Sequence, residues 1–242
     1  MGSVTIKAQR KAETGEIEAK SMVREAGAYF VAAILSVLIL IFVMQLWKAD
    51  LKVPFTYIGD GLFTAEGIKG MADNGWYLHN DYVGAPTGQD MQDYPNSDGL
   101  QLIVIKLLTF ATPNFGVAMN LYYLLTFPLT ALIALFVLRR LRLSYTASLL
   151  GSLLYTFIPY HFMRGEGHLY LSGYYVVPLA VLAIHWVYSE TPLFYRDDSS
   201  VRHFDVMNFD AVTALIAALL ISSTGIYYAR KPACRRDKPA QE

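Results

Sequence analysis

The chain has a single cysteine among its 242 residues, Cys234, near the C-terminal end. One cysteine cannot form an intramolecular disulfide, and it excludes a Cys-x-x-Cys metal site. The P-loop, the dinucleotide fingerprint GxGxxG, the zinc-protease motif HExxH and the hydrolase motif GxSxG are all missing. Lys plus Arg and Asp plus Glu balance at 20 each, so the sequence lacks the basic excess typical of nucleic-acid-binding proteins.

Long hydrophobic runs are present, and they indicate the class of the protein. Hydrophobic residues make up 54% of the chain and the mean hydropathy is +0.33, whereas soluble domains have about 45–50% apolar residues. Residues 28–47 carry no charge and are long enough to cross the roughly 30 Å of a bilayer's hydrocarbon core. The alternative is a cleaved signal peptide. The run is longer than a typical signal-peptide core and no small-residue cleavage site follows it, so we expect an uncleaved first span.

Later hydrophobic segments predict further spans, at residues 115–138, 144–163 and 169–188, with a fifth candidate at 210–228. Residues 100–112 are too short to span, and we expect an interfacial or re-entrant segment there. The predicted fold class is all-α: a multi-pass transmembrane helix bundle with a large extracytoplasmic loop containing short interfacial helices. The expected order is a cytoplasmic N-terminal tail (1–27), a first transmembrane helix (28–47), the extracytoplasmic loop (48–114), a bundle of three to four helices (115–229) and a basic tail (230–242).

The distribution of Lys and Arg predicts the orientation. The N-terminal tail and the arginine cluster at 139–142 are basic, so both should be cytoplasmic, with loop 48–114 outside. This describes a multi-pass protein of the bacterial inner membrane with a cytoplasmic N-terminus. A crossing at 210–228 would place the basic tail outside, against the same rule. Either that segment does not cross, or the chain is a truncated part of a longer many-span protein, which the change of composition after Ala229 leads us to expect.

The loop 48–114 holds most of the polar residues that could carry chemistry. Acidic residues outnumber basic ones there, and Gly and Pro recur along it, which predicts sharp turns rather than one long helix. Asp60 lies between Gly59 and Gly61, so its carboxylate can approach a substrate with little hindrance and act as a general base towards a hydroxyl group. The alternative is an aspartate that only shapes the turn.

The same loop contains candidate sugar-binding residues. Trp76 and His79 lie among amides, acids and rings in segment 73–80, where a ring can pack on a sugar face and polar groups can bind its hydroxyls. The alternative is a turn whose aromatic residues anchor at the membrane interface. Asp93 and Tyr94 complete the candidate substrate-binding set of this loop.

Three aspartates of the loop offer the oxygen ligands that a hard divalent cation prefers: Asp90, Asp93 and Asp98. Aspartates in a polar loop are more often simply solvated, which is the alternative. We therefore assign no metal site, and a divalent cation is the one cofactor considered.

A second polar feature is the turn between the third and fourth predicted spans, which contains Arg164, Glu166 and His168. The orientation places it on the same side of the membrane as the acidic loop. The fork of donors on Arg164 suits the phosphate of a lipid carrier. Glu166 could orient Arg164 or act as a second acid. The alternative is a short loop closed by an ion pair.

The chain resembles a known family in a series of motifs. GDG, GWYLHN, GAPTGQDMQDYP and SDGLQL follow the first span, and PYHFMRGEGHLYLSGYYVVPL comes later. This pattern is similar to the N-terminal part of bacterial GT-C-type membrane glycosyltransferases, including the YfhO-like ones, over about residues 28–229. The resemblance implies transfer of a sugar from a polyprenyl-phosphate-linked donor to a cell-envelope acceptor on the extracytoplasmic side, without a nucleotide sugar.

The resemblance also implies roles for individual residues. Asp60 matches the family's catalytic acid in the first outer loop, and Arg164 and His168 match its phosphate contacts. Family members usually have more spans, so the resemblance implies a longer protein or a separately encoded C-terminal half as partner.

The alternatives to a transferase are a non-catalytic membrane subunit, a transporter or flippase of lipid-linked sugars, and an inactive fragment. Polar residues gathered in outer loops favour surface chemistry over transport, because transporters place polar groups at mid-membrane.

Overall fold

The computed structural model describes residues 2–92, 98–198 and 201–224, with side chains from residue 20 onward except in 196–203. Within these ranges the chain is mostly helical. The α-helices are α1 (Gly2–Val43), α2 (Gly61–Asn74), α3 (Gly99–Ala111), α4 (Phe115–Arg140), α5 (Tyr145–Thr156), α6 (Pro159–Arg164), α7 (Leu169–Ser172), α8 (Val177–Tyr188) and α9 (Phe209–Ser223). Short 3-10 turns are η1 (Leu46–Lys48), η2 (Glu166–His168) and η3 (Tyr174–Val176).

Two antiparallel hairpins lie outside the bundle. One pairs β1 (His79–Asn80) with β2 (Gln89–Asp90), and the other pairs β3 (Tyr195–Asp198) with β4 (Val201–Phe204). The prediction of an all-α fold is therefore correct for the bundle and wrong for these two polar segments.

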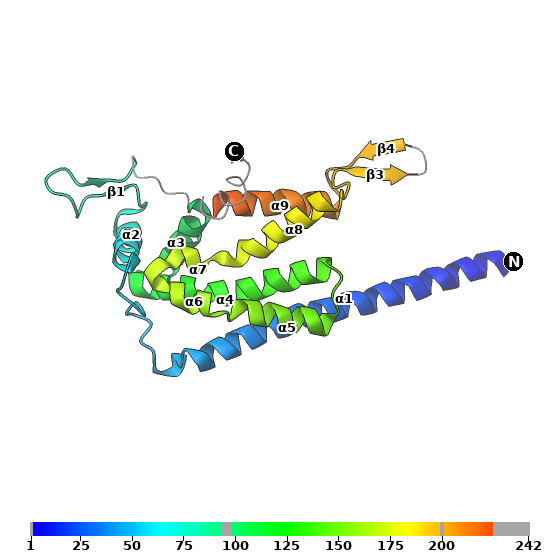
Figure 1. Cartoon of the computed structure of the whole chain (residues 1–242), viewed down its shortest axis with the longest axis horizontal. Coiled ribbons are helices and arrows are strands. Elements are labelled where there is room, and N and C mark those ends of the chain that lie inside the picture. Colours follow the sequence, from blue (N-terminus) through cyan, green and yellow to red (C-terminus); the bar gives the residue numbers. More distant parts are fainter. Residues whose placement is uncertain (1, 93–97, 199–200, 225–242) are drawn as a thin grey trace, which may run out of the picture.

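Helix α4 is the centre of the bundle (Figure 1). It contacts α1 and α5 on one side and α8 on the other, and α9 packs on α8. Helices α2, α3, α6 and α7 gather at one end, together with the β1–β2 hairpin, whereas the N-terminus and the β3–β4 hairpin lie at the opposite end. Loop 48–114 and the turn after α6 therefore meet at the same end of the molecule, as the sequence predicts.

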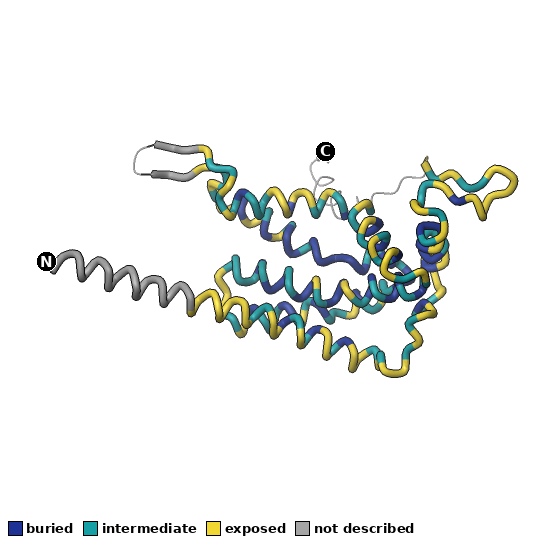
Figure 2. Tube along the Cα trace, turned by 180° about the vertical axis from the view of Figure 1, so that it is seen from behind, coloured by how far each residue is buried: buried dark blue, intermediate teal, exposed yellow. Residues whose placement is uncertain are grey.

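Three helical segments of the described chain are long and apolar enough to cross a membrane: Lys20–Val43, Phe115–Arg140 and Glu166–Tyr188. They match the first, second and fourth predicted spans. Helices α3 and α9 are apolar but shorter. Many residues of α1 from Lys20 onward are exposed (Figure 2), including Phe30 and Phe42 at 66% and 74%. Exposed apolar surface on this scale is expected where lipid covers a helix.

The predicted third span, residues 144–163, is not one helix. Helix α5 ends at Thr156, and α6 begins at Pro159 after Ile158, whose backbone is extended. Pro159 has no N–H to continue the helix, and its ring disfavours helical geometry at the residue before it. The first predicted span also ends early, because α1 stops at Val43 and Gln45 has a left-handed backbone at φ 50°.

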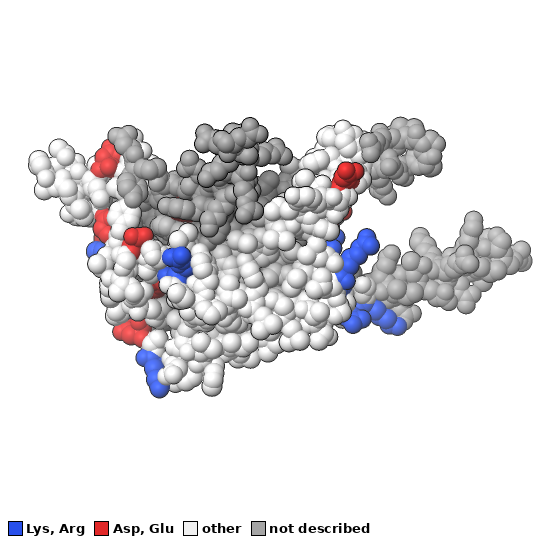
Figure 3. Space-filling view, viewed as in Figure 1, with Lys and Arg blue, Asp and Glu red and all other residues white. Residues whose placement is uncertain are grey.

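On the face shown in Figure 3, charged side chains lie mostly towards the two ends of the molecule, with most of the acidic ones at the α2 end. The described surface between the two ends is almost free of charge on this face. The opposite end has Arg139 and Arg140 in the last turn of α4. A neutral belt between two charged ends is the charge pattern expected of a membrane-spanning bundle.

Candidate functional site

Asp60 is held in place by the connection between α1 and α2, which packs against the start of α4. Asn120 of α4 is fully buried and donates two hydrogen bonds from Nδ2, to the carbonyls of Leu51 and Val53 at 2.9 and 2.8 Å. Its Oδ1 accepts the backbone N–H of Phe55 at 3.3 Å. The side-chain amide of Asn120 thus supplies hydrogen-bond partners to three backbone groups that lie outside any helix or strand.

Glycines let the Asp60 turn approach the turn after α6. A Cβ on Gly61 would lie 3.1 Å from the carbonyl oxygen of Glu166, and a Cβ on Gly167 would lie 3.2 Å from that of Ile58. Gly59 has φ +60°, a conformation that L side chains rarely adopt, and its Cβ position is 3.2 Å from the carbonyl oxygen of Gly167. The GDG and GEG sequences are therefore the two halves of one backbone-to-backbone contact.

Glu166 joins the same two segments through its side chain. It is only 1% exposed, and its Oε2 accepts the backbone N–H of Thr56 at 3.1 Å. The prediction that Glu166 orients Arg164 has no counterpart in this geometry, because the guanidinium of Arg164 lies over the ring of Tyr160 at 5.2 Å. In the structure Glu166 positions the Asp60 turn.

These contacts bring Asp60 and His168 together. Asp60 Oδ2 and His168 Nδ1 are 3.1 Å apart, although the residues are 108 positions apart in the chain. The side chain of Asp60 is 75% exposed and that of His168 is 37% exposed, so a substrate can reach the pair. A carboxylate bonded to an imidazole is a unit that can accept or release a proton.

The pair opens into a cavity of about 140 Å³, which we call the Asp60 cavity. It lies between α2, the start of α3 and α7, and its lining is Asp60, Thr64, Asp98, His168, Leu169, Tyr170 and Leu171. Asp98 is thus a second carboxylate beside the pair. Burial raises the pKa of Asp98 to about 6, so this group changes charge close to neutral pH.

The other predicted site residues lie in different places. His79 lines a neighbouring hollow and its Nε2 is 2.9 Å from Asp81 Oδ1. Trp76 packs on Tyr77 with ring centroids 5.2 Å apart. Neither these two residues nor Arg164 lines the Asp60 cavity. Asp93 and Tyr94 lie outside the described residues.

Sequence reasoning missed Thr64 and Tyr170, and considered Asp98 only as a metal ligand. Thr64 is one helical turn after Asp60 in α2, a spacing that places both on one face. That signal is available from the sequence once the helix is assumed to start at Gly61. Tyr170 carries no such signal, because its place in the cavity depends on the contact between the GDG and GEG turns.

No cluster of three or more His, Cys, Asp or Glu side chains with metal-binding geometry occurs among the described residues. Of the three aspartates considered as cation ligands, Asp90 and Asp98 are described and Asp93 lies outside the described residues. No protein family model, curated protein or solved structure matches the chain.

Proposed function

We propose that the chain is a membrane glycosyltransferase that moves a sugar from a polyprenyl-phosphate-linked donor to a hydroxyl acceptor. The observation that carries the proposal is the hydrogen-bonded Asp60–His168 pair in a solvent-accessible cavity at one end of an apolar bundle. A lipid-linked substrate presents its reacting group at such an end while its chain stays in the bilayer.

The chemistry needs one proton acceptor and one leaving group. Asp60 takes the proton from the acceptor hydroxyl while the hydroxyl oxygen attacks the anomeric carbon of the sugar. The bond from that carbon to the phosphate oxygen breaks, and the lipid phosphate leaves with the electron pair. With Nδ1 protonated, His168 donates to Oδ2 of Asp60, which fixes the carboxylate and leaves Oδ1 as the atom that takes the proton. Arg164, at the end of α6, is the candidate contact for the departing phosphate.

The orientation in the membrane is part of the proposal. Arg139 and Arg140 at the end of α4 lie opposite the Asp60 cavity. Basic residues favour the cytoplasmic side, so the cavity faces outwards, where cell-envelope acceptors are found. The localisation that fits is the bacterial inner membrane, with the N-terminus in the cytoplasm.

The test is transfer from a synthetic polyprenyl-phosphate sugar by the purified chain. Asp60→Asn keeps the size and most hydrogen bonds of the side chain but cannot take the proton, so the rate should fall by about 10²–10⁴-fold. Asp205→Asn at the opposite end is the matched control. Asp205 accepts the N–H of Met207, a bond that Asn can also accept, so this variant should transfer at the wild-type rate. Full activity in Asp60→Asn would overturn the proposal.

One observation favours a second candidate, a transporter or flippase of lipid-linked sugars. His161 is fully buried where the helix breaks between α5 and α6. Its Nε2 is 2.8 Å from Thr126 Oγ1 and its Nδ1 is 2.9 Å from the carbonyl oxygen of Thr156. A broken helix with polar groups inside a bundle is a feature of transporters. Scrambling of a fluorescent polyprenyl-phosphate sugar across proteoliposomes, unchanged in Asp60→Asn, would support this candidate over the transferase.

A further inference from the structure

Three hollows lie in a row along α2. The Asp60 cavity shares Thr64 and Tyr170 with a small hollow of about 40 Å³. That hollow shares Glu66, Gly70 and Asn80 with a wider, open one of about 440 Å³. We call the three together the α2 groove. The lining residues of the three hollows follow α2 from the Asp60–His168 pair to the β1–β2 hairpin.

The sequence of α2 builds the floor of the groove. Phe63, Glu66, Gly70 and Asp73 recur at helical spacing and all line it. Gly67 lies among them, and a Cβ at this position would meet nothing within 4 Å. Glycine inside a helix costs roughly 1 kcal/mol relative to alanine, so the open floor is maintained at the expense of helix stability.

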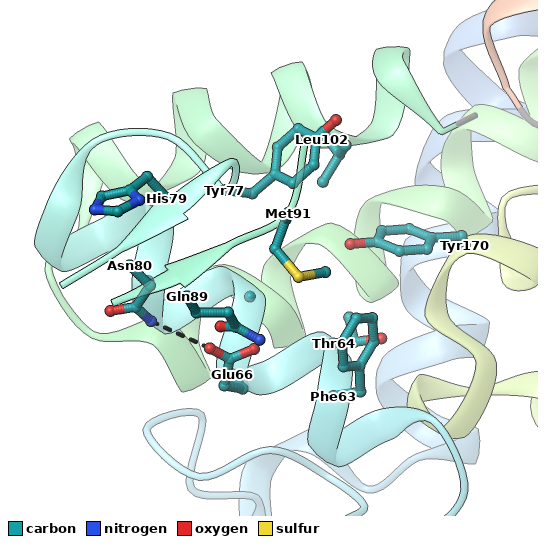
Figure 4. A pocket seen from close by; sticks show the side chains of 12 residues that line it. Phe63, Thr64, Glu66, Tyr77, His79, Asn80, Gln89, Met91, Leu102 and Tyr170 are labelled. Atoms are coloured by element: carbon teal, nitrogen blue, oxygen red, sulfur yellow. Dashed lines mark hydrogen bonds between the residues drawn. The ribbon is translucent and has the colours of Figure 1, made fainter. Parts of the chain in front are cut away.

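Fixed polar groups and rings form the walls (Figure 4). Asn80 is only 8% exposed, and its Nδ2 donates to Glu66 Oε1 at 3.1 Å. Its Oδ1 accepts from Asn74 Nδ2 at 2.7 Å, which sets the orientation of the amide. The rings of Tyr77 and Tyr170 line the small hollow beside it. Oriented polar groups next to aromatic rings suit a sugar, whose hydroxyls can bind the polar groups while the C–H face of its ring packs on an aromatic ring.

The charge of the groove excludes an anionic ligand. Asp60, Asp98, Glu66 and Asp73 all line it. Lys69 also lines it and pairs with Asp73, Nζ to Oδ2 at 2.7 Å, so these two charges offset each other and Asp60, Glu66 and Asp98 leave the groove acidic. An anionic chain lying along the groove would be repelled by these carboxylates, whereas a neutral polyol would not. The groove therefore fits the acceptor rather than the phosphate of the donor.

We infer that the α2 groove binds a short neutral oligosaccharide, with its terminal hydroxyl at Asp60. The role of this oligosaccharide as acceptor rests on the proposed transferase function, whereas its binding does not. The end of the groove at the Asp60 cavity determines which hydroxyl of the oligosaccharide reaches Asp60. The open end near the β1–β2 hairpin lets the remaining sugars extend into solvent.

The experiment is calorimetric titration of the purified full chain with maltotetraose and chitotetraose as neutral probes, and with tetragalacturonate as the anionic one. Gly67→Phe adds a large side chain to the groove at a position where a Cβ meets nothing within 4 Å. Gly27→Phe is the matched control, because a Cβ on this exposed residue of α1 also meets nothing within 4 Å. At least one neutral tetrasaccharide should bind, its Kd should rise about tenfold or more in Gly67→Phe, and Gly27→Phe should match wild type.

The results separate the two proposals because no donor is present in the titration. Failure of both neutral probes to bind, equal binding by tetragalacturonate, or unchanged affinity in Gly67→Phe would each overturn the groove inference. Binding that responds to Gly67→Phe in a chain that shows no sugar transfer would refute the transferase and leave the groove intact. Circular dichroism of the two phenylalanine variants is the check that both are folded.

Discussion

The backbone N–H of Thr56 and Oε2 of Glu166 are 3.1 Å apart and join segments separated by 110 positions in the sequence. This bond ties the connection that precedes Asp60 to η2, the turn that carries His168. Glu166 is buried, so the bond is sheltered from water. Loss of the hydrogen bond between Thr56 and Glu166 would therefore act on the stability of the Asp60 turn rather than directly on the Asp60 carboxylate.

Glu166→Ala should therefore destabilise the protein. The substitution leaves the N–H of Thr56 without its acceptor, at a cost of about 1–3 kcal/mol. Glu166→Gln is the matched control, since its amide oxygen can still accept that bond. Thermal unfolding in detergent measures the difference. If Glu166→Ala and Glu166→Gln have the same melting temperature, the bond to Thr56 contributes nothing.

Two glycines of this end should respond in opposite ways to alanine. Gly59 has φ +60° and lies against the carbonyl of Gly167, whereas Gly67 is helical and has free space. Gly59→Ala should cost about 1–2 kcal/mol from the left-handed backbone alone, and it should also lower transfer by displacing Asp60. Gly67→Ala should be neutral or stabilising by up to about 1 kcal/mol. Chemical unfolding curves of both variants give the comparison, and a stable Gly59→Ala would contradict the close contact of the two turns.

Asp98 predicts a pH-dependent contribution to stability. Burial raises its pKa from 3.8 to about 6, so between these values the folded chain holds a proton that the unfolded chain has released. The contribution of Asp98 to the free energy of unfolding is fully present below the unfolded pKa of 3.8. It is lost as the pH rises through the folded pKa of about 6. Asp98→Asn, which stays neutral, should gain melting temperature relative to wild type as the pH is raised from about 4 to about 7. A constant difference between the two proteins over that range would show that Asp98 is not buried as described.

Much of the fold is predictable because hydrophobic length is a strong signal. Residues 115–138 match α4 almost to its ends, and residues 169–188 fall within a segment long enough to span. The prediction of a third span was wrong at Pro159. Proline interrupts the helix there although the residues on both sides are apolar. The hairpin at 79–90 was missed because its strands are too short for any alternating pattern to show.

The site was predictable only in part. Asp60 could be chosen because its flanking glycines are visible in the sequence, and orientation placed His168 on the same side. Their contact at 3.1 Å depends on the meeting of two glycine turns, which no local pattern encodes. The cavity role of Asp98 depends on where α3 begins relative to α2, and this is a property of tertiary packing.

The most direct test of the central claim is a double-mutant cycle on Asp60 and His168. Sugar transfer from the polyprenyl-phosphate donor is measured for wild type, Asp60→Asn, His168→Gln and the double variant. If the two side chains act as one unit, each single variant loses activity and the double variant is no worse than Asp60→Asn, because the effects are not additive. Losses that multiply in the double variant, or a wild-type rate in Asp60→Asn, would contradict the pair as the reacting centre.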